Sequence, residues 1–279
     1  IKILLYKYKM SIDITSLPVF YISFTQKPDL EQKLKKRQFT DINHFPAVNG
    51  KKLDLDYLYK TGKIGNRVFY ELTHGRSDGA GISSKGALGC YLSHISLYKK
   101  MVDEDIPYAI ISEDDTILKK FKKNKLNNIV TEVYQQEPDT LLLFGVHSNE
   151  FKKESLSDEN SLQKDIDQVQ KFYGTHFYMI SKETCKKILK HALPIEMQID
   201  SFLSTIGNKE EINIQSLKHK IADYEPFRNI FNSSVQKPCY KCLLPNSPWF
   251  YRIFILVFLT LLILGVISFV KYKNCKKNC

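Results

Sequence analysis

Three consecutive carboxylates, Glu113, Asp114 and Asp115, follow an apolar run that begins at Tyr108. Like charges held side by side repel, so such a triplet stays ionised only where a cation or hydrogen-bond donors lie among them. Side chains alternate along an extended backbone, which would point Glu113 and Asp115 to one side and Asp114 to the other. Two carboxylates at that spacing are able to hold Mn²⁺ or Mg²⁺ while diphosphate oxygens take the remaining metal positions. The alternative is that the acids only cap a turn after a strand.

The residues around this triplet predict strands that alternate with helices. Apolar, β-branched runs predict strands over 18–24, 108–111, 139–145 and 175–181. Helices are predicted from Pro28, from Gly89 and, with Ser181 as the N-cap, through His191. This alternation predicts an α/β domain with a mainly parallel sheet over about residues 15–205. In such sheets ligands lie at the carboxyl ends of strands, where the acidic triplet is found.

The glycine-rich stretch from Thr73 to Gly89 excludes two common nucleotide-binding classes. It contains no GxxxxGK[ST] sequence, and Gly79 with Gly81 lacks the third glycine of a dinucleotide fingerprint. A kinase-like function and an NAD-dependent function therefore have no support.

The positive charge of the chain does not indicate a nucleic-acid partner. The formal net charge is +11, and the last 31 residues contribute five basic side chains and no acid. The remaining +6 is spread among many acids and is not gathered into a basic arm, so we expect no nucleic-acid binding.

The C-terminal region predicts a membrane anchor. The 18 residues from Ile253 to Val270 carry no charge, and Trp249, Tyr251 and Tyr272 flank them. Such a run is typical of a single transmembrane helix. The side of the membrane stays open, because the absence of a recognisable signal peptide and the lysines of the short tail favour opposite orientations. The predicted regions are an extension (1–15), a catalytic domain (16–205), a linker (206–248), a transmembrane helix (249–271) and a basic, cysteine-containing tail (272–279).

Six cysteines leave the cellular compartment undetermined. Cys90 and Cys185 fall inside predicted helices and are expected to be buried. Cys239 and Cys242 form a CxxC pair, which alone is weak evidence for metal or redox chemistry.

Four segments in a fixed order resemble glycosyltransferase family 25. They are AVNG, GALGCYLSHISLYKKMVDEDIPYAIISEDDTIL, DTLLLFG and GTHFYMISKETCKKILKHALPIEMQIDSFL. The resemblance covers roughly residues 17–205, and the central segment is its most specific part. That family includes bacterial lipooligosaccharide β-galactosyltransferases and collagen hydroxylysine galactosyltransferases. The resemblance implies a GT-A-like nucleotide-sugar-binding fold, a UDP-hexose donor carrying galactose or glucose, Mn²⁺ or Mg²⁺, and inversion at the anomeric carbon.

The resemblance also implies roles for particular residues. Glu113 and Asp115 would bind the metal, and Asp200 would be the base that deprotonates the acceptor hydroxyl. For Asp200 the alternative is a helix N-cap. His94 would bind phosphate or metal, or else be a helix histidine bonded to a loop carbonyl. Residues expected to support donor binding are Ser93, Lys85 and Asp114.

Some features depart from the family pattern. Family members commonly have an acid in the position of Ala87, and their arginine-rich turn after the first strand is represented only by QKPDLEQK. His176 is expected to be structural. The sequence thus predicts a membrane-anchored glycosyltransferase acting on a glycan, glycolipid or glycoprotein acceptor. The alternative is an inactive, membrane-tethered module that binds a sugar or a protein.

Overall fold

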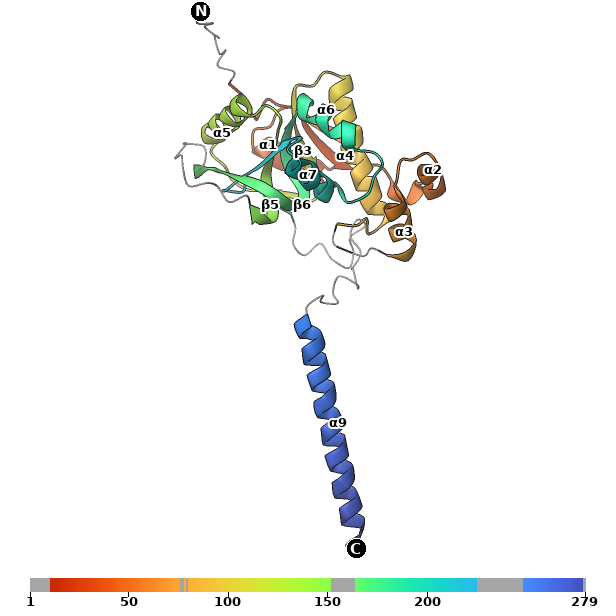
Figure 1. Cartoon of the computed structure of the whole chain (residues 1–279). Helices are drawn as coiled ribbons and strands as arrows, with labels where there is room; N and C mark the ends of the chain where they lie inside the picture. The colour runs from red at the N-terminus through yellow and green to blue at the C-terminus, as the bar shows by residue number, and fades with distance from the viewer. Residues whose placement is uncertain (1–10, 76–77, 79, 152–163, 225–247, 278–279) are drawn as a thin grey trace, which may run out of the picture. The chain divides into compact units, whose positions relative to one another are not determined.

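The computed structural model describes residues 11–75, 78, 80–151, 164–224 and 248–277 (Figure 1). The chain divides into two compact units, one formed by residues 1–76 and 80–238 and the other by 77–79 and 239–279. Each unit is described by itself.

The first unit is built on a mixed six-stranded sheet in the order β2-β1-β3-β6-β5-β7. β6 runs antiparallel to β3, β5 and β7, while β1 is parallel to both β2 and β3, and β5 is parallel to β7. The sheet is therefore mainly parallel, as the sequence predicts, with one reversed strand inserted near its centre. Its strands are β1 (Val19–Ser23), β2 (Ile42–Pro46), β3 (Tyr108–Glu113), β5 (Thr140–Phe151), β6 (Ile166–Ser181) and β7 (Asn213–Leu217). A two-stranded sheet joins β4 (Thr116–Leu118) to β8 (Ala222–Tyr224).

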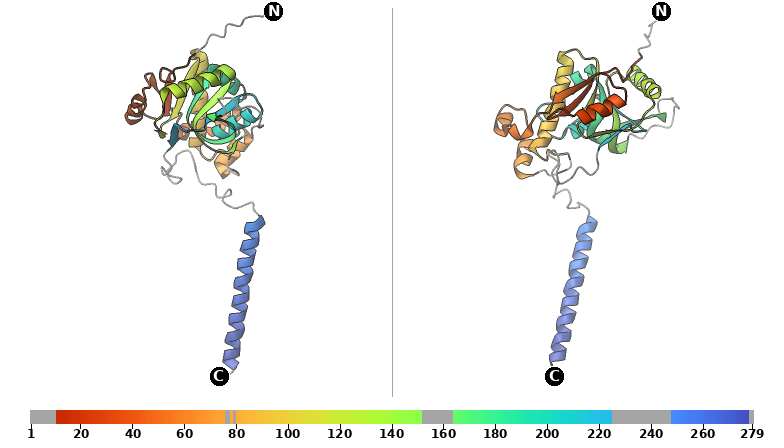
Figure 2. Two further views of the ribbon diagram at one scale, coloured as in Figure 1. Left: turned by 90° about the vertical axis from the view of Figure 1, so that its left-hand side faces the viewer. Right: turned by 180° about the vertical axis from the view of Figure 1, so that it is seen from behind.

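Helices cover both faces of this sheet (Figures 1 and 2). Strand residues alternate between two apolar clusters: Ile111 lies in the cluster with α4, α6 and α7, and Ile110 lies in the cluster with α1 and α5. The result is a three-layer α/β architecture. The helices of this unit are α1 (Pro28–Lys36), η1 (Gly50–Lys52), α2 (Leu55–Lys60), α3 (Asn66–His74), α4 (Lys85–Asp103), α5 (Lys123–Gln136), α6 (Lys182–His191) and α7 (Ile199–Asn208).

Local sequence explains where the helices that flank the site begin. Pro28 opens α1, since its fixed φ suits the first helical turn and it lacks an N–H. The Ser84 side chain caps α4 by accepting a hydrogen bond from the N–H of Ala87. Ser181 caps α6 by accepting from the N–H of Thr184, as the sequence predicts.

The predicted transmembrane helix over 249–271 is the expectation that the structure overturns. A helix, α9 (Pro248–Lys277), forms there, but no helix among the described residues is long and apolar enough to cross a membrane. The predicted membrane anchor and the single-pass localisation are therefore wrong.

Candidate functional site

The acidic triplet lies where the central strands of the sheet end. Glu113 is the last residue of β3 and pairs with Ile22 of β1. On its other side β3 is antiparallel to β6, with Ser112 opposite Phe177. The next residues in this register are Glu113 and His176, and Glu113 Oε2 lies 3.8 Å from His176 Nδ1. A carboxylate and an imidazole far apart in the sequence therefore meet at the edge of the sheet.

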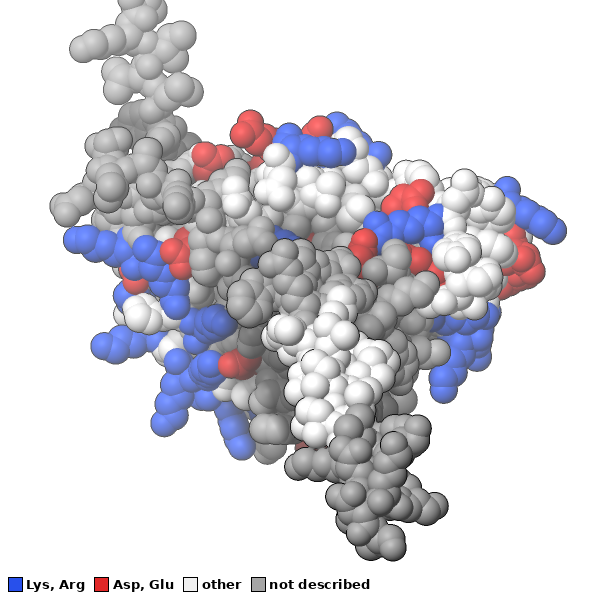
Figure 3. Space-filling view, turned by 60° about the horizontal axis from the view of Figure 1, so that its bottom comes forward, with Lys and Arg blue, Asp and Glu red and all other residues white. Residues whose placement is uncertain are grey.

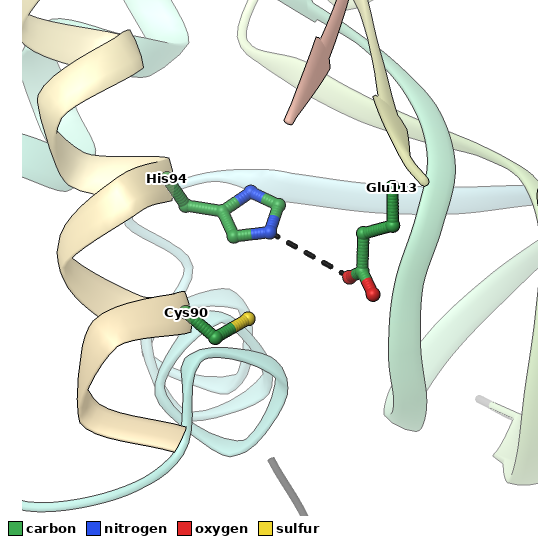
Figure 4. Close-up of side chains that lie close together, drawn as sticks. All are labelled: Cys90, His94 and Glu113. Carbon is green, nitrogen blue, oxygen red and sulfur yellow. Dashed lines mark ion pairs between the residues drawn. The ribbon is translucent and has the colours of Figure 1, made fainter. Parts of the chain in front are cut away.

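The other carboxylate oxygen of Glu113 faces α4. Thr175 Oγ1 donates a hydrogen bond of 2.6 Å to Glu113 Oε1, and His94 Nε2 lies 3.6 Å from the same oxygen (Figure 4). Burial raises the pKa of Glu113, but its interactions with His176 and His94 outweigh burial and hold the pKa well below the ordinary value. Glu113 is therefore ionised at neutral pH.

The surroundings of Asp115 favour its protonated form, in contrast to those of Glu113. Burial, and next the charge of Glu113, raise its pKa from 3.8 to about 6. Its Oδ1 is buried and has no hydrogen-bond partner among the described residues. Atoms of Glu113, Asp115 and His176 able to ligate a metal all lie within 4.8 Å of one another. Two carboxylates, one with an unused buried oxygen, and an imidazole fit a divalent cation such as Mn²⁺.

Asp114 is directed elsewhere. Its Oδ2 forms an ion pair of 2.9 Å with Lys27 Nζ, at the start of α1. Lys27 and Asp114 line a small cavity together with Asp115 and Thr116. The segment that stands in place of the family's arginine-rich turn therefore does bring a cation to the acidic triplet.

His94 is fully buried and connects the acids to the core of the first unit. Its Nδ1 lies 2.8 Å from the hydroxyl of Tyr178, which in turn lies 2.6 Å from the hydroxyl of Tyr98. The polar contacts of the ring are to Tyr178, Thr175 and Glu113, and these are not the bond to a loop carbonyl that the sequence offered as an alternative.

Ser93 and Lys85 fasten the segment after β2 to α4. Ser93 Oγ accepts from the N–H of Val48 at 2.8 Å and donates to the carbonyl of Gly89 at 2.7 Å. Lys85 Nζ donates to the carbonyl of Leu53 at 3.0 Å. A cavity of about 420 Å³ lies beside this contact, and it is lined by Ile22, Ser23, Phe24, Ala47, Val48, Asn49, Gly50, Lys51, Gly86, Cys90, Ser93, His94, Glu113 and Asp114. Lys85 is not among those lining residues.

Asp200 lies in the first turn of α7, where the N-cap position belongs to Gln198. Asp200 Oδ1 accepts from the N–H of Ser201 at 2.7 Å, and Oδ2 accepts from the N–H of Gly174 at 3.1 Å. Burial raises its pKa, and these backbone hydrogen bonds oppose that shift. The carboxylate thus links α7 to β6 two residues before His176.

Sequence reasoning missed two residues of the site, His176 and Lys27. No local pattern marks His176, because only the register of β6 against β3 brings it to Glu113. Lys27 could have been suspected from its position after β1, directly before Pro28. Ala87, where relatives commonly have an acid, is buried in the core cluster that contains α4.

Comparison with known proteins gives the family. The family model described as Glycosyltransferase family 25 (LPS biosynthesis protein) matches residues 16–203. Procollagen galactosyltransferase 1 of Danio rerio is 26% identical over 199 residues, covering 70% of this chain and 32% of the relative. A glycosyltransferase 25 family member of Drosophila melanogaster is 27% identical, covering 71% and 31%. Procollagen galactosyltransferase 2 of Homo sapiens is 23% identical, covering 80% and 33%. The chain thus spans about a third of the length of these relatives, and with two thirds of its residues matched by the family model it belongs to glycosyltransferase family 25.

Proposed function

We propose that this chain transfers a hexose, galactose or glucose, from a UDP-sugar to a hydroxyl group of a glycan, glycolipid or protein, with a divalent metal and with inversion. The observation that carries the proposal is the cluster of Glu113, Asp115 and His176 at the carboxyl end of β3. It lies beside a cavity whose lining includes Glu113 and Asp114. In α/β sheets this crevice is where nucleotide ligands bind.

The metal would be held by Glu113 Oε2, by Asp115 and by His176. When bound, it would neutralise the charge that develops on the departing nucleoside diphosphate. Glu113 supplies an ionised ligand at neutral pH, because the two histidines lower its pKa. A neighbouring cation favours the charged form of Asp115, whose pKa is otherwise raised to about 6.

The donor would occupy the cavity of about 420 Å³ between the ends of β1 and β2 and the first turns of α4. Lys27 forms an ion pair with Asp114 of the acidic triplet, and it would pair with donor phosphate in the complex. Ser93 would support donor binding indirectly, because its hydroxyl holds Val48, a residue of the cavity wall, against α4.

Asp200 is the proposed base. Inverting transfer requires a carboxylate that takes the proton of the acceptor hydroxyl as that hydroxyl attacks the sugar. The raised pKa of Asp200 makes it a stronger proton acceptor than an exposed aspartate, while two backbone N–H groups fix its orientation. His94 would position Glu113, because it is fully buried beneath that residue.

The test is transfer and hydrolysis by the full chain with a panel of UDP-sugars and Mn²⁺. We expect turnover that is selective for one donor, is abolished by a chelator, and falls at least about a hundredfold in Asp115→Asn. Asp139→Asn is the matched control, because Asp139 pairs with Lys187 next to the first residue of β5. If no donor is turned over, and UDP-sugar binding is equal with and without Mn²⁺, the chain is a binding module and the enzymatic proposal fails.

A further inference from the structure

A second group of metal-ligating side chains lies directly beside the proposed one. Cys90 Sγ, His94 and Glu113 place their ligand atoms within 4.8 Å of one another (Figure 4). Cys90 and His94 are four residues apart in α4, so both project from one face of the helix toward the end of β3. The cavity lining includes all three residues.

We propose that Cys90, His94 and Glu113 form a second cation site, selective for Zn²⁺ or a similar thiol-binding ion. Thiolate, imidazole and carboxylate are the ligands that zinc takes in proteins, whereas Mn²⁺ and Mg²⁺ favour oxygen ligands. Three protein ligands leave a fourth position, which would open toward the cavity. The proposal does not depend on the transfer reaction, because the site is defined by metal binding alone.

The separation of the donors suits that ion. With zinc–ligand bonds of about 2.0–2.3 Å, donor atoms around a tetrahedral ion lie about 3.3–3.8 Å apart. His94 Nε2 lies 3.6 Å from Glu113 Oε1. The pair is therefore already at the spacing of two ligands on one ion.

The surroundings of His94 and Glu113 support the same role. A ligating histidine usually donates its other N–H to a fixed acceptor, which sets its tautomer. The Tyr178 hydroxyl is within 2.8 Å of His94 Nδ1 and can accept that hydrogen bond while donating its own proton to Tyr98, 2.6 Å away. Thr175 donates to Glu113 Oε1 and so orients the ligating oxygen.

Charge also favours a cation at this position, because the carboxylates of Glu113, Asp115 and Asp200 act electrostatically on Cys90. These acids face Cys90 from β3, from the turn after β3 and from α7. The ion would replace the thiol proton, which passes to solvent as the metal–sulfur bond forms.

The two sites share one carboxylate. Glu113 Oε1 faces His94, and Oε2 faces His176. Two divalent ions on opposite oxygens of one carboxylate repel each other, so Zn²⁺ bound at the thiol site should weaken Mn²⁺ binding at the other.

The direct test is titration of the full chain with Co²⁺, whose bond to a thiolate gives charge-transfer absorption. Serine replaces four cysteines throughout: Cys239, Cys242, Cys275 and Cys279. We expect saturable absorption that Zn²⁺ abolishes by displacing Co²⁺ and that is lost in Cys90→Ser. Cys185→Ser, which removes the other described cysteine, should leave it unchanged. Tyr178→Phe should weaken binding about tenfold. Absence of the band, or its persistence in Cys90→Ser, overturns the proposal.

A second measurement leaves the site residues intact. Zn²⁺ should slow alkylation of Cys90 by a maleimide in the folded protein at least about tenfold, as followed by mass spectrometry, and Mg²⁺ should not. Equal protection by both ions, or none by Zn²⁺, would contradict a thiol-selective site even if Cys90→Ser proved unable to fold.

Discussion

At the scale of single residues, the negative charge of Glu113 disfavours ionisation of the neighbouring Asp115. Burial, and next the charge of Glu113, raise the pKa of Asp115 to about 6. The two histidines keep Glu113 charged. An aspartate whose pKa is higher in the folded protein than in the unfolded chain destabilises the fold when it is charged. This destabilisation is absent below the unfolded value of about 3.8 and fully present above about pH 6. Metal-free protein should therefore become less stable, through Asp115, as the pH rises from about 4 to about 6.

Asp115→Asn should remove this destabilisation, because asparagine carries no charge to bury beside Glu113. Without metal at pH 7 we expect the variant to melt about 2–4 °C above the native chain, which corresponds to roughly 1 kcal/mol for a domain of this size. The difference should shrink toward pH 4, where Asp115 is protonated in the native protein. Adding Mn²⁺ should raise the Tm of the native chain and leave the variant nearly unchanged. Thermal unfolding followed by circular dichroism checks this, and a lower Tm for metal-free Asp115→Asn at pH 7 would contradict it.

Lys27 offers a separate test at the residue scale. Its ion pair with Asp114 is partly exposed, with side-chain exposures of 31% and 37%, so it should contribute little to stability. Lys27→Ala should raise KM for the UDP-sugar about five- to tenfold, because one charge contact to phosphate is lost.

The matched control is Lys119→Ala, which removes an ion pair of the same length to Asp223 on the β4–β8 sheet. Neither variant should shift the Tm by more than about 2 °C. A KM that is unchanged in Lys27→Ala, or equally raised in both variants, would exclude Lys27 from donor binding.

At the scale of secondary-structure elements, the apolar pattern of the sequence predicted the strands and helices that have a continuous buried face. β1 and β3 are buried almost throughout, and α6 carries both an N-cap serine and an apolar face. β2 and β7 were not predicted, because their sequences, INHFP and NIQSL, mix polar with apolar residues and contain no apolar run like that of β1. Glu113 and Asp115 were singled out from local sequence, but His176 was not, because its place beside Glu113 depends on the register of two strands.

One contact between elements depends on glycine and shapes the cavity of about 420 Å³ beside α4. A Cβ at Gly50 would lie 1.8 Å from the carbonyl oxygen of Lys85, and a Cβ at Gly89 would lie 2.6 Å from the carbonyl oxygen of Val48. The segment after β2 therefore rests directly on the backbone of α4. Only glycine permits this approach without displacing one of the two walls of the cavity.

Gly50→Ala should push η1 away from α4. We expect a loss of about 1–3 kcal/mol of stability, a Tm lower by about 2–10 °C, and weaker UDP-sugar binding. Lys52→Ala, at an exposed position of η1 outside the cavity lining, is the control and should change neither quantity. Calorimetric titration and thermal unfolding of the two variants give both numbers. Unchanged binding in a folded Gly50→Ala protein would show that this cavity does not hold the donor.

At the scale of the whole molecule, the two units differ in how their apolar side chains are arranged. Both apolar clusters are made of residues between Ile12 and Ala222. In α9, the apolar side chains described from Ile253 to Ile267 are 46–68% exposed, and Figure 3 shows no charged side chain among them. A contiguous exposed apolar surface of this kind drives association or aggregation.

Removing residues 239–279 should therefore separate stability from association. We expect the shortened chain to keep the Tm of the full chain within about 2 °C, since no core residue is lost, and to keep its transfer activity in solution. The full chain should elute from a size-exclusion column as a species larger than its 32.5 kDa mass, and the shortened chain as a monomer. A full chain that elutes as a monomer at every concentration would mean that the apolar surface of α9 does not associate. A large fall in the Tm of the shortened chain would mean that residues after 238 contribute to the core, because stability lost on deletion has to come from contacts that the deleted residues made.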